Sequence, residues 1–133
     1  MYNTYLTGPL YVGSLRTPIN VLYESAFTVS LISVSSCVGK CKGKFVAEKS
    51  TTYKAVDGPD YMMFFSDFNV VTVSEAQDTL CLGLDASTCV KDFWFRVVKY
   101  ATDMEYTDGF LGLATKGIAD DTGDVKSYMY SLK

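Results

Sequence analysis

The segment from residue 23 to residue 37, YESAFTVSLISVSSC, constrains the fold more than any other part of this chain. Residues 21–23 form a short apolar run of β-forming type, and residues 27–31 alternate between apolar and polar side chains, the pattern of a half-buried strand. The residues between them, Glu24, Ser25 and Ala26, are therefore predicted to form an acidic turn that joins two strands. Because a carboxylate placed between buried strands costs solvation free energy, this turn indicates a functional site or the remnant of one.

The acidic turn resembles the Asp-Thr-Gly motif in the N-terminal lobe of pepsin-like aspartic proteases. The alignment of that family with residues 23–37 needs no gap. The resemblance sets Glu24 on the catalytic aspartate, Ser25 on the threonine and Ala26 on the glycine, so all three motif residues are substituted. Cys37 falls on the first cysteine of a small disulfide loop of the family, which Cys41 closes here.

Three further segments resemble the same family, in the same order and at compatible spacing. They are residues 45–56, similar to its Phe-x-Pro-x-x-Ser-Ser-Thr-Tyr segment, residues 76–83, similar to the strand after its flap, and residues 108–114, similar to its Asp-Gly-Ile-Leu-Gly-Leu signature. The resemblance covers about residues 11–133. It implies an all-β fold, a pepsin-like β-barrel lobe of antiparallel strands with a flap-like hairpin and one C-terminal helix, in which Glu24 lies on a turn packed near Gly112.

The length of the chain allows one domain. Its 133 residues, 48% of them hydrophobic, suffice for one well-packed core and not for two. We therefore expect residues 1–133 to form a single lobe, half of a bilobal aspartic protease. Each lobe of those enzymes supplies one catalytic aspartate, and no second Asp-Thr-Gly or Asp-Ser-Gly occurs in this sequence. Half of the resembled active site is then missing, and the sequence leaves open whether a second lobe is encoded separately.

Charge and hydropathy argue against two classes of partner. The net charge is −3 and the twelve Lys and Arg residues are scattered, so no basic surface for nucleic acid is predicted. No run approaches the length of a transmembrane helix, and residues 1–10 lack the pattern of a signal peptide. We expect a soluble chain that does not span a membrane. Whether Met1 is a natural or a processed start stays open.

The four cysteines form two close pairs, Cys37 with Cys41 and Cys81 with Cys89, and the chain has no histidine. A zinc site made of four thiolates is conceivable, but the spacings differ from the usual zinc knuckles. The first pair matches the small loop of the resembled family, and the second would staple a turn between two strands of a hairpin. Two disulfides are therefore predicted, and they imply the secretory pathway, the extracellular space or another oxidising compartment. Buried reduced thiols are the alternative.

Residues 61–73, YMMFFSDFNVVTV, occupy the place of the flap, the hairpin that covers substrate in the resembled proteases. Phe65 falls on the tyrosine of that flap, so the hydroxyl near the cleft is lost. Ser66 and Phe68 replace glycines that allow the tip to turn, which predicts a stiffer hairpin. The apolar residues of this run can be core throughout, or core on one face with the other face open to a partner.

The remaining predictions come from periodicity and turn residues. They are a first hairpin from residues 11–13 and 19–23, a strand over residues 90–100 whose Trp94 fills core or interface, and an amphipathic helix over residues 124–132. Asp103 and Glu105, with Asp108 nearby, lack the ligand spacing of an EF-hand, so these three residues are expected on a solvated face.

The substituted motif argues against catalysis. In an aspartic protease two carboxylates share a proton and activate a water between them. Glu24 adds a methylene, and a misplacement of about 1 Å can cost on the order of a hundredfold in rate. Ala26 adds a Cβ where glycine allows a close backbone approach, and only Ser25 keeps the hydroxyl of its counterpart. We therefore expect no enzyme and no cofactor or metal, but a pseudoenzyme derived from an aspartic endopeptidase.

The leading hypothesis for function is a structural or interaction subunit of a larger assembly. A single lobe would expose the apolar face around Phe27, Leu111 and Leu113 that its twin normally covers, which calls for a protein partner or a second copy of the chain. A peptide- or ligand-binding module that uses the remnant cleft beneath Phe65 is the alternative. An active homodimeric protease with two Glu24 side chains across a two-fold axis is a third hypothesis.

Overall fold

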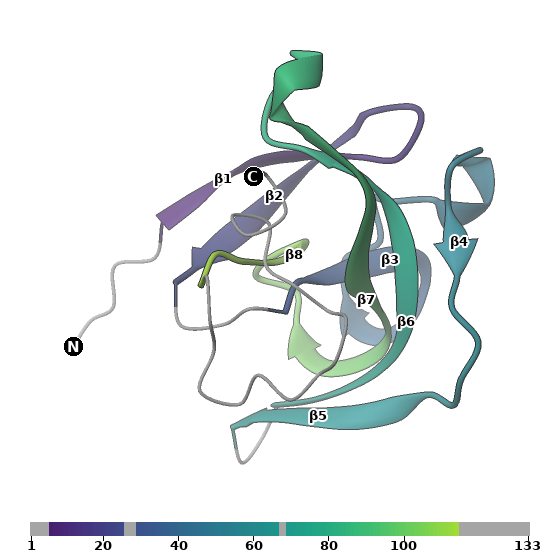
Figure 1. Ribbon diagram of the computed structural model, residues 1–133. Coiled ribbons are helices and arrows are strands. Elements are labelled where there is room, and N and C mark those ends of the chain that lie inside the picture. The colour runs from purple at the N-terminus through teal and green to yellow at the C-terminus, as the bar shows by residue number, and fades with distance from the viewer. Residues whose placement is uncertain (1–5, 26–28, 67–68, 115–133) are drawn as a thin grey trace.

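The computed structural model describes residues 6–25, 29–66 and 69–114, with the backbone alone for residues 65 and 66. The predicted helix over residues 124–132 lies outside this part of the chain. The described part is mostly β-strand, and its helical elements are two short 3-10 helices (Figure 1), so the all-β prediction is confirmed. Its elements are β1 Leu6–Val12, β2 Thr17–Glu24, β3 Leu31–Cys41, η1 Ala47–Lys49, β4 Lys54–Ala55, β5 Tyr61–Ser66, β6 Asn69–Cys81, η2 Ala86–Thr88, β7 Cys89–Met104 and β8 Gly109–Gly112.

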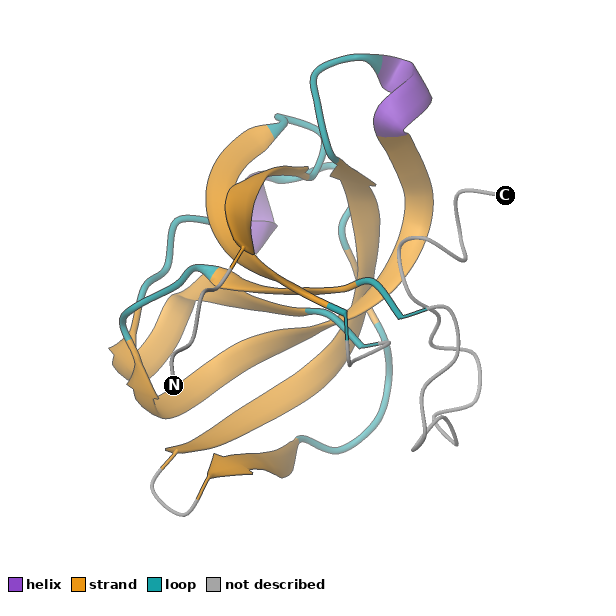
Figure 2. Ribbon diagram, turned by 90° about the vertical axis from the view of Figure 1, so that its left-hand side faces the viewer, coloured by secondary structure: helices purple, strands orange, loops and turns teal. Residues whose placement is uncertain are grey.

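The strands form one sheet in the order β1-β2-β8-β3-β7-β6-β4, with β5 paired to β6 outside this path. A second pairing joins the end of β1 to β6, through Tyr11 with Cys81 and Val12 with Leu80, and closes the path into a ring. Figure 2 shows the strongly curved strands that result. Closure of this kind removes sheet edges that would otherwise be exposed.

The sheet is mixed: most of its pairings are antiparallel, as predicted, but two are parallel. β2 runs parallel to β8, and β3 runs parallel to β7. β8 lies between β2 and β3, although those two strands follow each other in sequence. Alternation of side chains predicts that a segment is a strand but not which distant strand it joins, and both parallel pairings are of this distant kind.

The first hairpin has longer arms than predicted. β1 and β2 pair from Leu6 with Tyr23 to Val12 with Thr17, so Pro18 lies inside a strand instead of in the connecting loop. The loop turns at Gly13 and Arg16, which both have positive φ, and the Arg16 amide donates to the Gly13 carbonyl at 3.1 Å. A Cβ at Gly13 would lie 2.7 Å from Ser50 Oγ, so glycine suits both the conformation and the space at this turn.

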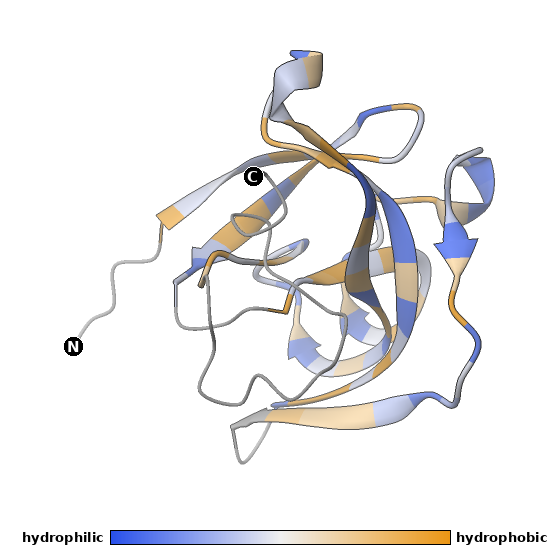
Figure 3. Ribbon diagram, viewed as in Figure 1, coloured by the Kyte–Doolittle hydropathy of each residue, from blue (hydrophilic) through white to orange (hydrophobic). Residues whose placement is uncertain are grey.

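Two apolar cores lie on the two faces of the β6–β7 ladder, along which hydrophobic and hydrophilic residues alternate (Figure 3). The first core fills the closed ring; its members are Leu10, Val12, Ile19, Val21, Ile32, Val34, Phe45, Ala76, Leu80, Phe93, Phe95, Val97 and Leu111. The second core is smaller, with Leu22, Leu31, Val71, Val73, Val98, Ala101, Met104 and Phe110. Trp94 is half-buried and belongs to neither cluster.

The β5–β6 hairpin divides its apolar residues between two faces, the second of the two arrangements expected for it. Tyr61 and Met63 pack against the second core, whereas the side chains of Met62 and Phe64 are exposed. The side chain of Phe65 and residues 67 and 68 lie outside the described part, so the expected change in flap shape stays a prediction.

Candidate functional site

The acidic turn begins where β2 meets β8. Glu24 is the last residue of β2, is half-buried and pairs with Gly112 of the parallel strand β8. The Leu113 amide donates to the Glu24 carbonyl oxygen at 2.9 Å. Ser25 follows as an exposed turn residue, and Ala26 lies outside the described residues. Glu24 thus lies beside Gly112, as the sequence predicts, but it belongs to strand β2 and not to the turn, because it continues the parallel ladder with β8.

Ser30 fixes the other side of β8. This buried serine accepts a hydrogen bond from the Gly112 amide at 2.9 Å, and its carbonyl accepts one from the Arg96 amide at 2.9 Å. A Cβ at Gly109 would lie 2.2 Å from the Leu31 carbonyl oxygen, so only glycine permits β8 to approach β3 this closely. The backbone beside Glu24 is therefore held from both neighbouring strands.

Asp108 corrects the prediction of a solvated acidic face. It is almost completely buried, and its Oδ2 accepts from the Asn20 amide at 2.8 Å and lies 3.4 Å from Lys44 Nζ. Its Oδ1 has no hydrogen-bond partner in the described structure. The sequence could not show this, because the burial depends on β8 inserting between β2 and β3. Asp103 and Glu105 are exposed as expected.

A buried carboxylate that sequence reasoning missed joins two of the family-like segments. Asp78 of β6 is fully buried and accepts three hydrogen bonds: from Ser50 Oγ at 2.7 Å, from Thr52 Oγ1 at 2.5 Å and from the Thr79 amide at 2.7 Å. Ser50 Oγ also accepts from the Ser14 amide at 3.0 Å. The segment after η1 is thus fastened to β6 and to the first hairpin loop.

The signal for this network was present in the sequence. Asp78 occupies a strand position between Ala76 and Leu80, whose side chains share its face and belong to the first core. An acidic residue at such a position must have local donors, because an unpaired buried charge costs too much free energy. The electrostatic consequence reaches Tyr53, whose pKa is raised by burial and, next, by the negative charge of Asp78.

A second polar cluster lies at the base of the β5–β6 hairpin. The Tyr61 hydroxyl and Arg96 Nε both donate to Glu75 Oε2, at 2.5 Å and 3.2 Å. The guanidinium carbon of Arg96 lies 5.0 Å from the centre of the Tyr61 ring, and Arg96 Nη1 lies 3.5 Å from Met63 Sδ. The cluster therefore ties β5 to β6 and β7 through polar contacts at the margin of the second core.

Tyr61 provides a measurable test of this cluster at alkaline pH. Its pKa is raised, first by burial and then by the hydrogen bond to Glu75, because both disfavour the phenolate. Because the pKa of Tyr61 is higher in the folded than in the unfolded protein, its protonated hydroxyl stabilises the fold at pH values below the unfolded pKa of about 10. This stabilisation is lost as the pH rises from about 10 toward the folded-state pKa. We expect Tyr61→Phe to remove a late component from the absorbance titration of the tyrosines. Tyr100→Phe, at an exposed position, is the matched control for loss of one phenol. Identical titration curves for the Tyr61→Phe and Tyr100→Phe variants would contradict this expectation.

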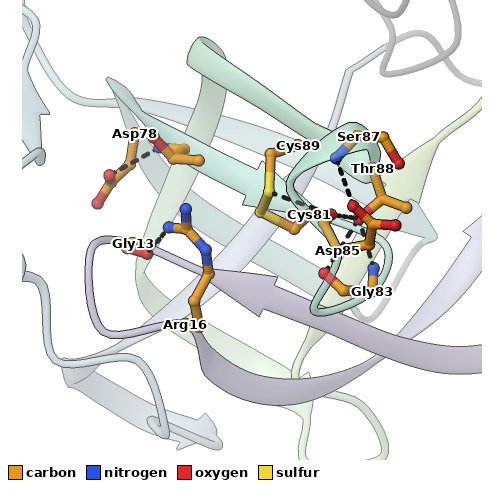
Figure 4. The surroundings of a disulfide bond; sticks show 10 residues. Gly13, Arg16, Asp78, Cys81, Gly83, Asp85, Ser87, Thr88 and Cys89 are labelled. Carbon is orange, nitrogen blue, oxygen red and sulfur yellow. Dashed lines mark hydrogen bonds between the residues drawn. A yellow bond between two sulfur atoms is a disulfide. The ribbon is translucent and has the colours of Figure 1, made fainter.

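Both predicted disulfides are present, Cys37 with Cys41 and Cys81 with Cys89. The four thiols are therefore not available as zinc ligands, and the two bonds are compatible with an oxidising compartment. Cys81 and Cys89 close the β6–β7 turn (Figure 4).

Within that turn, Asp85 caps the short helix η2, because its Oδ1 accepts from the Ser87 amide at 3.0 Å. Thr88 Oγ1 bonds to the backbone of Gly83 at 3.0 Å, as Figure 4 shows. These contacts add to the disulfide as cross-links within the turn at this end of the β6–β7 ladder.

The described residues contain no group of three or more His, Cys, Asp or Glu side chains arranged to hold a metal ion. A comparison with known protein families and with curated protein sequences finds no match for this chain. In the part that the structure describes, no helix has the length and apolar character needed to cross a membrane.

The sequence-predicted site residues are only partly brought together. Glu24 and Ser25 lie at the β2–β8 junction, whereas Phe65 belongs to β5. Leu111 was expected on an open apolar face, but it is fully buried in the first core, and Leu113 packs partly buried against that core. Phe27 lies outside the described residues. Among the described residues, large apolar side chains are exposed singly on β1 (Leu6) and β3 (Val38), and as a pair at alternate positions on β5 (Met62 and Phe64).

Proposed function

We propose that this chain is a catalytically inactive module related to aspartic endopeptidases and acts as a structural or interaction subunit of a larger assembly. The observation that carries the proposal is the junction of Glu24 with Gly112. This is the place where the resemblance sets the catalytic aspartate, and a longer carboxylate occupies it. The neighbouring Ser25 and Ala26 replace the other two residues of the motif.

Contacts between the four family-like segments support the relationship. The segment around Glu24 pairs with residues 109–112 through β2 and β8. The segment of residues 45–56 joins that of residues 76–83 through the bonds from Ser50 and Thr52 to Asp78. Segments that were matched separately by sequence thus meet in pairs in the fold, which chance matches have no reason to do.

The loss of catalysis follows from the chemistry of the motif. General acid–base hydrolysis of a peptide by this route needs two matched carboxylates on either side of one water. The 133 residues carry one such turn, in which glutamate displaces the carboxylate relative to aspartate. An interaction role remains for a well-packed module of this kind, and the exposed apolar pair Met62 and Phe64 supports it.

We expect no cleavage of an unfolded protein substrate between about pH 2 and about pH 8. The assay compares the chain with its Glu24→Gln variant and with an active aspartic protease as positive control. The triple change Glu24→Asp, Ser25→Thr, Ala26→Gly should also leave the isolated chain inert. Cleavage by the unmodified chain that an aspartic-protease inhibitor blocks and Glu24→Gln abolishes would overturn the proposal. Two Glu24 side chains sharing a proton across a two-fold axis would then be the leading explanation.

A further inference from the structure

Strand β5 is bonded along one side only. Its residues pair with β6 from Tyr61 with Val73 to Ser66 with Asn69, and among the described strands β6 is its one partner. Figures 1 and 2 both show β5 at the margin of the molecule, with β6 on one side and no strand on the other. A row of backbone N–H and C=O groups along a strand margin is a template for pairing with another chain.

The strands at the two ends of the sheet path, β1 and β4, carry features that hinder edge pairing, and β5 does not. β4 is only two residues long and carries Lys54, and the part of β1 that does not pair with β6 contains Pro9. Short length, lysine and proline are the usual means by which proteins prevent pairing at a sheet edge. β5 has six residues, YMMFFS, with no lysine, no proline and no charged side chain.

The described side chains of β5 that are exposed to solvent are apolar. Met62 and Phe64 are 60% and 68% exposed, while Tyr61 and Met63 pack against the second core. The strand therefore presents two large apolar side chains at alternate positions beside a backbone edge that pairs with no other described strand. A segment that fits it must be extended, uncharged and apolar at alternate positions.

We propose that β5 pairs antiparallel with β5 of a second copy of the chain, about a two-fold axis at Met63. The strand itself meets the requirements for its own partner, and two-fold pairing is the commonest symmetry of protein dimers. In this register Met62 of each copy lies opposite Phe64 of the other, which brings a thioether beside an aromatic ring twice. Asp60 then lies opposite position 66, so no acidic residues face each other.

The small apolar area that β5 exposes limits the expected affinity of this dimer. Two side chains per copy supply far less than the roughly 800 Å² per partner of a standard interface. The dimer should therefore be weak, with a dissociation constant above about 1 µM, and strand hydrogen bonds should supply much of its affinity. The inferred dimer gives the proposed interaction role a specific partner, and its biological purpose rests on that proposed function. The pairing of the two β5 strands does not depend on the resemblance to proteases.

Sedimentation of the whole chain from about 1 µM to about 1 mM tests the proposal. We expect a concentration-dependent dimer, and we expect Met62→Lys or Phe64→Glu alone to raise its dissociation constant about tenfold or more, since each change acts at two places in the dimer. The double variant Met62→Lys/Phe64→Glu sets opposite charges across the axis at both places and should recover most of the affinity. Leu84→Lys, at an exposed apolar residue on the β6–β7 turn, is the matched control and should have no effect.

A chain that is monomeric throughout this range would overturn the inference, as would a dimer that the single variants leave unchanged or that the double variant fails to recover. Circular dichroism of each variant shows that the fold is kept, as expected for substitutions at exposed positions. The outcome is separate from that of the protease assay. If the chain neither dimerises nor cleaves substrate, only the inferred dimer is wrong. If the chain cleaves substrate and an aspartic-protease inhibitor blocks the cleavage, the proposed function is wrong, and sedimentation still decides whether β5 pairs with a second copy.

Discussion

Replacing Asp78 with alanine is expected to lower the free energy of unfolding by about 3 kcal/mol, as measured by urea denaturation. The carboxylate is fully buried and is the shared acceptor for the Ser50 hydroxyl, the Thr52 hydroxyl and the Thr79 amide. Hydrogen bonds to a charged acceptor are stronger than neutral ones, and alanine leaves all three donors without this acceptor. The loss of unfolding free energy should be smaller than the sum of three such hydrogen bonds, because Thr52 is exposed and its hydroxyl can bond to water instead.

The matched control is Asp60→Ala. Asp60 pairs with Lys99 at 3.4 Å, but both side chains are about half exposed, and such surface pairs contribute about 0.5 kcal/mol or less. A second measurement, limited proteolysis, should show earlier cleavage near residues 47–53 in Asp78→Ala, because this segment loses its attachment to β6. Equal unfolding free energies for Asp78→Ala and Asp60→Ala would show that the network does not hold the segment.

The local features of the fold could be predicted from the sequence. The first hairpin, the strand that contains Trp94 and the disulfide-closed turn between Cys81 and Cys89 all follow from alternation, turn residues and cysteine spacing. Each of them depends on residues that are close together in the chain. Contacts between residues that are close in sequence can therefore be predicted from alternation, turn residues and cysteine spacing.

The features that could not be predicted depend on distant pairings. The parallel ladders of β2 with β8 and of β3 with β7 join residues that are 62 to 88 positions apart in the chain, and nothing in local alternation selects them. The burial of Asp108 is a consequence of the same topology: Asp108 immediately precedes β8, and the insertion of β8 between β2 and β3 places it beside Asn20 and Lys44. The candidate site was likewise predicted only in part. The position of Glu24 beside Gly112 was predicted, whereas the polar clusters around Asp78 and Arg96 were not.

The cluster at the base of the β5–β6 hairpin is expected to give the second large effect. Arg96→Met should lower the free energy of unfolding by about 2–3 kcal/mol, because it leaves the Glu75 carboxylate beside the second core without its positive partner. The side chain of Arg96 is 10% exposed and that of Glu75 is 23% exposed, so water reduces the penalty but does not remove it. Lys99→Met, in the exposed pair with Asp60, is the matched control and should cost well under 1 kcal/mol.

A double-mutant cycle separates the lost ion pair from lost packing. Replacing both residues, as Glu75→Leu/Arg96→Met, removes the charge together with its partner, and well-packed apolar residues often replace a buried ion pair at little cost. We therefore expect the double variant to be more stable than Arg96→Met alone, with a coupling energy of about 1–2 kcal/mol between the two positions. Additive effects of the two single changes would mean that Arg96 stabilises the hairpin through its contacts with the Tyr61 ring and Met63 Sδ, and not through Glu75.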